Sequence, residues 1–158
     1  MIYTIGYARL TPGRLSTILD LLHVDLLIDA RSSPRTRVAG MGMLQLNTRF
    51  GSRYQWRGET LGGRIAIAPK AIAALAEESR SKTLMVMCME EAPAECHRHH
   101  TIARPLGALG IPVSHVYREE IVSASELDAS IEKDRDYECE DLFAHASARA
   151  EILKGIKE

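Results

Sequence analysis

The sequence is short of cysteine and contains no long apolar run, and these absences exclude several classes of protein. Its three cysteines are an odd number, which argues against a disulfide framework, and the N-terminus lacks the basic and apolar regions of a secretory signal. No apolar stretch is long enough to span a bilayer, so no membrane partner is expected. We therefore expect a cytoplasmic protein with free thiols.

Repeats, low-complexity segments and the common nucleotide-binding fingerprints are also absent. Neither G-x-G-x-x-G nor G-x-x-x-x-G-K occurs, so the glycine-rich phosphate loops are not indicated. The chain has 158 residues, 46% of them hydrophobic, which is enough to bury a core without metals or disulfides. The sequence predicts one domain over 1–158, with an α/β core at 1–117 and an acidic C-terminal extension at 118–158.

Charge is distributed unevenly, although the formal net charge is only −1. The segment 31–64 holds a single acid, Glu59, whereas the residues after Tyr117 are mostly acidic. The arginines of the basic segment are Arg31, Arg35, Arg37, Arg49, Arg53, Arg57 and Arg64. Tyr54 and Trp56 lie among them, and this combination is typical of surfaces that bind phosphate groups or single-stranded nucleic acid through charge and stacking.

Strand and helix patterns alternate along the chain. Strands are predicted at 1–7, 24–30, 54–56, 82–90 and 111–117. Helices are predicted at 11–23, 43–49, 69–80, 97–110 and 138–152. The first helix has Thr11 as its N-cap and Pro12 as its first residue. The residues 57–64 are expected to form a glycine-containing turn.

This alternation predicts an α/β fold, with a mostly parallel sheet and helices on both faces, in Rossmann-like or rhodanese-like layering. In such folds, ligands bind in the crevice outside the carboxyl ends of the strands. Three polar segments stand where predicted strands end: Gly6 with Tyr7, Asp29 with Arg31, and Cys88 with Glu90. We expect these segments to meet at one edge of the sheet.

Residues 88–100, C-M-E-E-A-P-A-E-C-H-R-H-H, hold two cysteines and three histidines. Cys88, Cys96, His97 and His100 are all residue types that bind zinc. The seven residues between the two cysteines are more than the usual spacing of about two to four within a zinc-binding pair. No metal or other cofactor is therefore predicted, and a metal-stabilised domain stays an alternative.

The same two cysteines are candidates for a reactive thiol. Cys88 ends a buried strand, and Cys96 precedes a predicted helix whose N-terminus, together with Arg98, would lower a thiol pKa. The sequence favours neither cysteine, and Glu90 would oppose ionisation of Cys88. The structural alternative is that Cys88 is a small core residue.

Two further groups are candidates for substrate binding. Asp29 and Arg31 share one face of a strand because they are two residues apart, so they could form an ion pair or hold a substrate together. The alternative is that Asp29 caps the following loop. In L-G-G-R, residues 61–64, the paired glycines allow a close backbone approach, and Arg64 can bind an anion.

Several motifs, in this order, resemble the bacterial and phage family known as "domain of unknown function 488". The motifs are T-I-G-Y at 4–7, D-A-R at 29–31, L-G-G-R at 61–64, C-M-E at 88–90 and E-C-H-R at 95–98. Ala8 departs from the family pattern, in which a serine often follows the first motif. The resemblance covers Met1 to about Tyr117 and implies a small α/β domain. The site residues that it implies are Tyr7, Asp29, Arg31, Arg64, Cys88, Glu90, Cys96, His97 and Arg98.

Together these patterns favour an enzyme that acts on an anionic substrate, either phosphate-bearing or derived from nucleic acid. Tyr7, Arg31, Trp56, Arg64 and Arg98 would bind the substrate. Cys88 or Cys96 would be the nucleophile or redox thiol, and Asp29, Glu90 and His97 would carry protons or orient other groups. The first alternative is a module that binds nucleic acid or a nucleotide without catalysis, and the second is the metal-stabilised domain.

Overall fold

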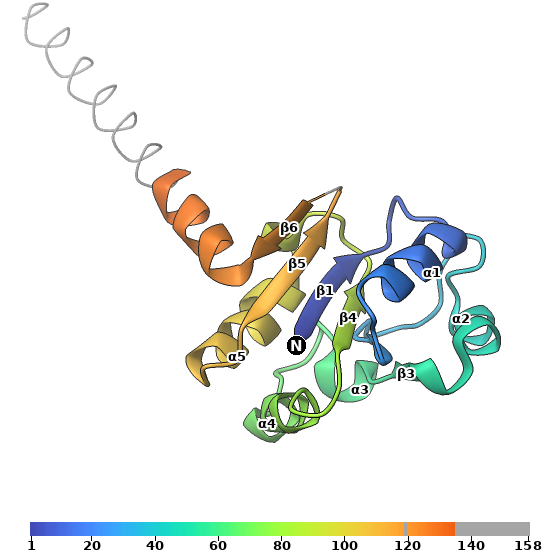
Figure 1. Ribbon diagram of the computed structural model, residues 1–158, viewed down its shortest axis with the longest axis horizontal. Helices are drawn as coiled ribbons and strands as arrows, with labels where there is room; N and C mark the ends of the chain where they lie inside the picture. The colour runs from blue at the N-terminus through green and yellow to red at the C-terminus, as the bar shows by residue number, and fades with distance from the viewer. Residues whose placement is uncertain (119, 135–158) are drawn as a thin grey trace, which may run out of the picture. The chain divides into compact units, whose positions relative to one another are not determined.

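The structure of the chain is a computed structural model that describes residues 1–118 and 120–134 (Figure 1). One compact unit spans Met1–Ala124, and a second begins at Ser125. The first unit carries the sheet and all of the candidate residues named above. In the second unit, residues 125–134 are helical, and the helix predicted at 138–152 lies outside the described residues.

The sheet has six strands in the order β3-β2-β4-β1-β5-β6. Their bounds are β1 Ile2–Gly6, β2 Leu26–Asp29, β3 Tyr54–Trp56, β4 Leu84–Cys88, β5 Val113–Tyr117 and β6 Glu120–Ser123. The first five strands are parallel, and β6 is antiparallel to β5. The α/β fold with a mostly parallel sheet is therefore confirmed.

Strand β6 was not predicted, and it shows that the sheet extends past Tyr117. Only two residues separate β5 from β6, and the first of them, Arg118, has the left-handed backbone angle φ 57°. Turns of this kind usually contain glycine or asparagine, and neither residue stands between the two strands. The acidic residues around β6 gave a pattern typical of a solvated segment rather than of an edge strand.

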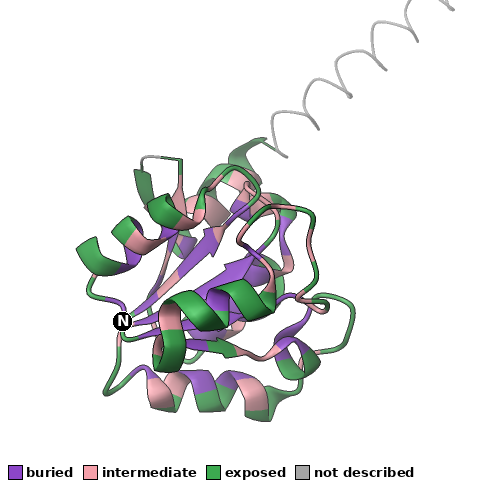
Figure 2. Ribbon diagram, turned by 90° about the vertical axis from the view of Figure 1, so that its right-hand side faces the viewer, coloured by how far each residue is buried: buried purple, intermediate pink, exposed green. Residues whose placement is uncertain are grey.

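Alternate residues of the strands pack against helices on opposite faces of the sheet. Helices α1 (Pro12–Leu21) and α2 (Met43–Phe50) cover one face, where Leu15 and Leu46 meet Met85 and Met87. The other face carries α3 (Gly58–Leu61), α4 (Pro69–Glu78), the π-helix η3 (Arg98–Ala103) and α5 (Arg104–Ala108). Figure 2 shows the buried strands between helices that expose one side to solvent. Helices on both faces are thus also confirmed.

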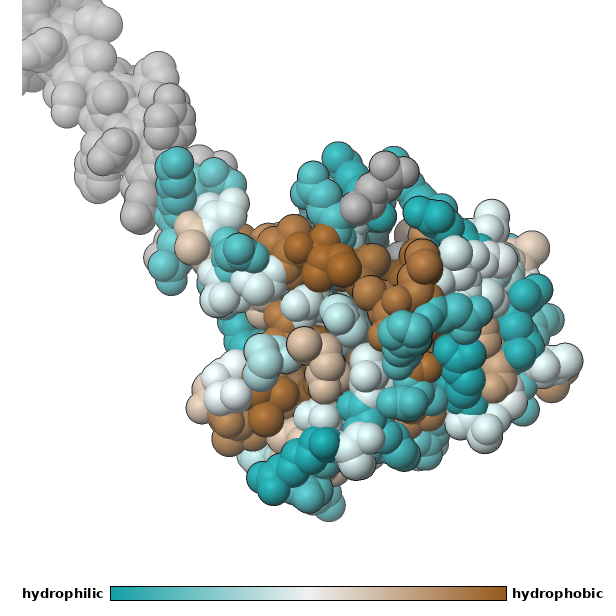
Figure 3. Space-filling model, viewed as in Figure 1, coloured by the Kyte–Doolittle hydropathy of each residue, from teal (hydrophilic) through white to brown (hydrophobic). Residues whose placement is uncertain are grey.

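Coverage of the α1 face is less complete at one end of the sheet. Val116 of β5 is paired with Ile121 of β6, and Val116 packs against the core of this face. Ile121 is 54% exposed, and Figure 3 shows apolar residues gathered over β5 and β6.

Among the described residues, no helix combines the length and the apolar character that a membrane span requires.

Helix α1 begins as the sequence predicts. Thr11 is the N-cap, and its Oγ1 accepts a hydrogen bond of 3.2 Å from the backbone nitrogen of Arg14. Pro12 is the first helical residue, where its missing N–H leaves no bond unmade. Leu15 and Leu19 are buried under this helix, and burial of each such side chain contributes about 1.5–3 kcal/mol.

Two segments differ from the prediction. The residues 57–64 contain the short helix α3 rather than only a turn. The helix predicted at 97–110 is divided into the π-helix η3 and the α-helix α5. Pro105 lies in the first turn of α5 and has no N–H to donate to the preceding turn, which explains why regular α-helical bonding does not run through this segment.

The chain leaves β1 and β4 toward opposite faces of the sheet. After β1 it enters α1 on one face, and after β4 it enters η3 and α5 on the other, so the crevice of this fold opens beside β4. Pairing continues past the strand ends, because the nitrogens of Tyr7 and Ala8 donate to the carbonyl oxygens of Cys88 and Met89 at 3.1 and 3.0 Å. A Cβ at Gly6 would lie 1.8 Å from the Glu90 carbonyl oxygen, so only glycine fits there.

Candidate functional site

A cavity of about 390 Å³ lies at the carboxyl ends of β1, β2 and β4. It brings together segments that are far apart in the sequence, as expected for strand ends in a parallel sheet. The residues that line it are Tyr7, Arg31, Ser32, Ser33, Arg35, Gly63, Arg64, Cys88, Met89, Glu90 and His97. Six of the predicted site residues are among them: Tyr7, Arg31, Arg64, Cys88, Glu90 and His97.

Arg31 and Asp29 form a buried bidentate ion pair. Arg31 Nε donates to Asp29 Oδ1 at 2.8 Å, and Arg31 Nη2 donates to Asp29 Oδ2 at 2.5 Å. The backbone nitrogen of Arg31 also donates to Oδ1, at 3.1 Å. Burial acts to lower the pKa of the Arg31 guanidinium, but the bonds and charge of Asp29 outweigh burial and raise it. Arg31 is therefore a fixed cation.

Three aromatic residues hold this pair in place. The guanidinium carbon of Arg31 lies 4.8 Å from the centre of the buried Tyr7 ring. The Tyr54 hydroxyl donates to Asp29 Oδ2 at 2.7 Å, and the Trp56 indole N–H donates to the Arg31 carbonyl oxygen at 2.8 Å. Burial and the bond to Asp29 raise the pKa of Tyr54, so its hydroxyl stays a donor.

Two of the predicted site residues, Asp29 and Trp56, lie outside the lining of the cavity. Asp29 is fully buried, receives hydrogen bonds on both carboxylate oxygens and does not line the cavity. Asp29 orients Arg31, and it has no contact with the cavity through which it could take a proton from a substrate. Trp56 does not line the cavity either. Its indole supports the backbone of Arg31, so it presents no stacking surface to a ligand in the cavity.

One donor of Arg31 has no partner. Its Nη1 atom is buried and makes no hydrogen bond to any residue that the structure describes. The side chain is 4% exposed and lines the cavity. A buried donor left without an acceptor costs about 1–3 kcal/mol, and more when the group is charged. The cavity is thus bordered by a fixed cation, one nitrogen of which has no hydrogen-bond partner among the described residues.

Four polar side chains form a compact cluster on another wall of the cavity. The ligating atoms of Cys88, Glu90, Cys96 and His97 all lie within 4.8 Å of one another. Glu90 Oε2 accepts from the thiols of Cys88 and Cys96 at 2.9 and 3.1 Å. His97 Nδ1 lies 3.6 Å from Cys88 Sγ and 3.7 Å from Cys96 Sγ. We refer to these four residues as the cysteine cluster.

The L-G-G segment orients His97 in this cluster. His97 Nε2 lies 3.0 Å from the Leu61 carbonyl oxygen, and because a carbonyl only accepts, Nε2 must carry the proton. In the neutral ring the Nδ1 lone pair then faces the two sulfurs. A Cβ at Gly63 would lie 2.7 Å from Nδ1 and 2.8 Å from Cγ of His97. Gly63 therefore gives the imidazole the room that a larger residue would occupy.

The two thiols are in opposite electrostatic situations. The neighbouring Cys96 and burial raise the pKa of Cys88. The Cys88 thiol, acting against burial, lowers the pKa of Cys96 to about 5, with help from His97 and Arg98. Burial acts to lower the pKa of His97, but the hydrogen bond to Cys96 raises it overall. Hydrogen bonds from the thiols outweigh burial and lower the pKa of Glu90.

The geometry disfavours a single thiol nucleophile. Cys96, whose pKa is lowered, is 1% exposed and does not line the cavity. Cys88 does line the cavity, but its pKa is raised. The two sulfurs therefore lie in one cluster, and the choice between Cys88 and Cys96 as a nucleophile stays open.

Arg98 supports the loop of the cysteine cluster. It is fully buried, and its Nη1 and Nη2 atoms donate to the carbonyl oxygens of Glu90 and Glu91 at 2.6 and 2.7 Å. Its backbone nitrogen donates to Cys96 Sγ at 3.5 Å. Arg98 does not line the cavity, and its guanidinium bonds to the loop backbone instead; the substrate-binding role predicted for it stays a prediction.

Other lining residues were not predicted as site residues. Ser32, Ser33 and Arg35 follow β2 and add two hydroxyl groups and a positive charge. The backbone nitrogen of Arg64 donates to Ser32 Oγ at 3.1 Å, which ties L-G-G-R to the end of β2. The signal in the sequence was S-S-P-R after a strand end, a pattern that is also typical of a surface turn. His100 is exposed, and its Nε2 lies 2.6 Å from the Ala94 carbonyl oxygen.

No family model, no curated protein and no solved structure matches this chain. The resemblance to the "domain of unknown function 488" family therefore stays a prediction.

Proposed function

We propose that this protein is an enzyme that acts on a small anionic substrate, bound in the cavity at the ends of β1, β2 and β4. The observation that carries the proposal is the free Nη1 donor of Arg31 in a buried side chain that lines the cavity. A carboxylate or phosphate oxygen in the cavity would supply the missing acceptor. Charge-assisted hydrogen bonds of this kind are about twice as strong as neutral ones.

Arg31 is organised for this role before a ligand arrives. Asp29 engages Nε and Nη2, and the Tyr7 ring lies against the guanidinium. The side chain therefore has little rotational freedom left to lose when an anion binds, which favours affinity. Asp29 neutralises the charge of Arg31, so the net attraction for an anion depends on the other arginines of the cavity.

Ser32, Ser33, Arg35 and Arg64 supply that attraction. The two hydroxyl groups can donate hydrogen bonds to an oxyanion, and Arg35 and Arg64 are exposed cations on the same lining. A phosphate ester or a carboxylate fits this set of donors. An uncharged sugar or an apolar molecule would leave them unpaired.

The size of the cavity favours a small molecule over a polynucleotide. Its volume of about 390 Å³ lies within the usual range for small-ligand sites, roughly 300–1,000 Å³. Single-stranded nucleic acid is usually bound on exposed aromatic rings. Tyr54 is buried, and both Tyr54 and Trp56 direct their polar groups toward the Asp29–Arg31 pair.

The groups that act on the substrate belong to the cysteine cluster. Cys88, Glu90 and His97 line the same cavity as Arg31. A substrate whose anionic end contacts Arg31 would therefore present another part of the molecule to a carboxylate, an imidazole and a sulfur. Groups of these types carry out proton transfer, nucleophilic attack and metal-assisted catalysis.

Anion binding is tested by titrating the full chain with inorganic phosphate and with acetate in a calorimeter. We expect Arg64→Ala and Arg31→Lys each to weaken binding about tenfold, the effect of losing one charge-assisted hydrogen bond. Arg37→Ala is the matched control, because Arg37 is exposed in the same loop and does not line the cavity. Equal affinities in all three variants would contradict the proposal.

Catalysis is tested separately, with a panel of small phosphate and carboxylate esters. We expect turnover of at least one class, and its loss in His97→Ala with phosphate binding retained. Phosphate binding without turnover of any ester would instead support a binding module. If tight binding to an oligonucleotide fell steeply with salt and phosphate did not compete, the partner would be nucleic acid.

A further inference from the structure

The cysteine cluster has the composition of a metal site. Two sulfurs, one imidazole nitrogen and one carboxylate oxygen converge within 4.8 Å of one another. From these donors we propose that Cys88, Glu90, Cys96 and His97 bind one Zn²⁺ ion on the wall of the cavity. The inference does not rest on the proposed function, because zinc binding is measured without a substrate.

The distances between donors fit a tetrahedral zinc ion. Bond lengths of about 2.3 Å to sulfur and 2.0–2.1 Å to nitrogen place a sulfur and a nitrogen roughly 3.6 Å apart at a tetrahedral angle. His97 Nδ1 lies 3.6 and 3.7 Å from the two sulfurs. The carboxylate oxygen is closer to the sulfurs, at 2.9 and 3.1 Å, so it would have to move outward by roughly half an ångström or more to reach tetrahedral separation.

The types of donor select among metal ions. Two cysteine sulfurs exclude calcium and magnesium, which take oxygen ligands. A set of two thiolates, one imidazole and one carboxylate is borderline-soft and four-coordinate, which suits Zn²⁺. With both thiols ionised, the three negative charges of Cys88, Cys96 and Glu90 are largely neutralised by the ion. Arg98, directly behind the loop, offsets the remainder.

The groups around the cluster already hold the ligands in the orientation that an ion requires. A metal-binding histidine commonly donates its second N–H to a backbone carbonyl, which directs the other nitrogen at the metal. His97 makes this contact with the Leu61 carbonyl oxygen, at 3.0 Å. Cys96 Sγ accepts from the Arg98 backbone nitrogen at 3.5 Å, and such contacts are common around thiolate ligands. Gly63 leaves the space that the imidazole occupies.

The local backbone explains why the spacing of the cysteines does not exclude zinc. The residues Pro93–Glu95 form a single 3₁₀ turn, η2, and the Cys96 nitrogen donates to the Pro93 carbonyl oxygen at 3.1 Å. Arg98 ties the start of the loop, at Glu90 and Glu91, to its end. The loop therefore doubles back and returns Cys96 to the end of β4. A long spacer is compatible with one ion when the spacer closes on itself.

An ion at this place would change the chemistry of the cavity. Both sulfurs become ligands, so neither is a free nucleophile. Cys88, Glu90 and His97 line the cavity, and the positive charge would therefore face the bound anion together with Arg31. The ion would also join the end of β4 to the loop 90–97, which fixes the shape of that wall.

The test uses the full chain purified without a histidine tag. We expect about one zinc per chain by elemental analysis. After removal of the metal, titration with Co²⁺ should produce the near-ultraviolet charge-transfer band of a cobalt–thiolate bond, and Zn²⁺ should displace it at one equivalent. This spectrum is measured on the unaltered sequence, so it does not depend on whether a variant folds. Its absence would overturn the proposal.

Four variants identify the ligands. Cys88→Ser and Cys96→Ser should each weaken zinc binding more than the 10–100-fold that is typical of changes in groups around a metal site. His100→Ala and Cys139→Ser are matched controls and should keep full affinity. Undiminished zinc affinity in both ligand variants, or its loss in either control, would assign the ion elsewhere and overturn the proposal. Arg64→Ala should keep its zinc while it loses phosphate binding, so the two proposals fail separately.

Discussion

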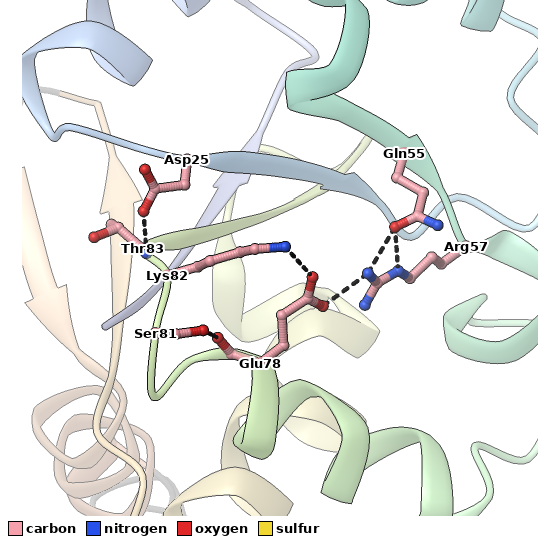
Figure 4. Close-up of polar contacts among 7 residues, drawn as sticks. All are labelled: Asp25, Gln55, Arg57, Glu78, Ser81, Lys82 and Thr83. Carbon is pink, nitrogen blue, oxygen red and sulfur yellow. Dashed lines mark hydrogen bonds and ion pairs between the residues drawn. The ribbon is translucent and has the colours of Figure 1, made fainter.

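Two arginine–carboxylate pairs of this molecule are held in different ways. Arg57, the residue after β3, pairs with Glu78 of α4 near the surface. Nη2 of Arg57 lies 2.7 Å from Glu78 Oε2, and both side chains are 20% exposed. Gln55 and Lys82 complete this network (Figure 4). Arg31 and Asp29 are almost fully buried, and one nitrogen of Arg31 is left over.

The difference separates a pair that folding alone explains from the pair on which the proposed function rests. Water can serve any group that the surface pair leaves unbonded, so that pair needs no ligand to explain it. The buried pair leaves a charged donor with no acceptor among the described residues, which folding alone does not favour. An unpaired buried donor beside a cavity is therefore a better indicator of a binding site than the number of arginines in a segment.

The strongest test of this contrast removes the buried carboxylate charge. Asp29→Asn leaves the Arg31 guanidinium buried without a counter-ion, so we expect a loss of about 3 kcal/mol in the free energy of unfolding. Urea denaturation measures the change. Asp20→Asn is the matched control, since its pair with Arg53 is 65% and 41% exposed, and it should cost less than about 1 kcal/mol. Similar losses of unfolding free energy in Asp29→Asn and Asp20→Asn would show that the buried and exposed pairs do not differ.

A second test alters the packing beside the cavity and leaves every charge in place. Gly63→Ala places a methyl group against the His97 ring, and we expect destabilisation of about 1–3 kcal/mol together with weaker zinc binding. Gly13→Ala is the control, because no atom lies within 4 Å of its added Cβ. Its position in α1 predicts a gain of up to about 1 kcal/mol. Equal changes in the free energy of unfolding for Gly63→Ala and Gly13→Ala would contradict the role given to Gly63.

A smaller effect is expected where an aromatic residue supports the buried pair. Trp56→Phe removes the 2.8 Å hydrogen bond to the Arg31 carbonyl oxygen, which should cost about 1 kcal/mol of stability. Phosphate affinity should fall slightly, because the backbone of Arg31 becomes less constrained. Calorimetric titration and urea denaturation of the same sample measure both quantities. Unchanged values would show that Trp56 does not position Arg31.

The smallest effect is expected at the surface pair. Burial opposes ionisation of Glu78, but the bonds from Arg57 and Lys82 prevail and lower its pKa below the ordinary 4.5. A depressed carboxyl pKa contributes stability that is present above the unfolded-state pKa and is lost as the pH falls through the folded-state pKa. Glu78→Gln should therefore cost at most about 1 kcal/mol at pH 7, and less at pH 3.5.

Urea midpoints of Glu78→Gln and the unaltered protein at pH 7 and pH 3.5 test whether the destabilisation becomes smaller at the acidic pH. Glu77→Gln is the comparison, since the Glu77–Arg80 pair is 71% and 73% exposed and should contribute almost nothing at either pH. A larger effect of Glu78→Gln at the acidic pH would reverse the assignment of Glu78 as an ionised partner.

The sequence predicts the frame of this molecule well because the relevant signals are local. Thr11 and Pro12 place the start of α1, and the apolar runs that end at Asp29 and Cys88 place the two central strand ends. The rule that parallel strands open on one edge then gathers Tyr7, Arg31, Cys88 and their neighbours into one cavity. Each of these steps depends on residues close together in the chain.

What the sequence did not reveal depends on contacts made after folding. The return of Cys96 to Cys88 requires the turn at Pro93–Glu95, and the inward direction of Arg98 follows from two backbone carbonyl groups that only the folded loop presents. The free donor of Arg31 also becomes visible only once Asp29 has engaged the other two nitrogens. Neither glycine nor asparagine stands between β5 and β6, so no turn signal marks the start of β6 in the sequence.

The strand order has a consequence for how the chain acquires its shape during synthesis. Strand β1 leaves the ribosome before the other strands of the sheet, yet it lies inside the sheet, with Ile2 paired to Leu84 on one side and to Val113 on the other. Pairings so distant in sequence form slowly, and until then both edges of β1 are open to mispairing with other chains. A nascent chain that stops short of Val113 would expose one of these edges, so translational pausing before that residue should favour aggregation.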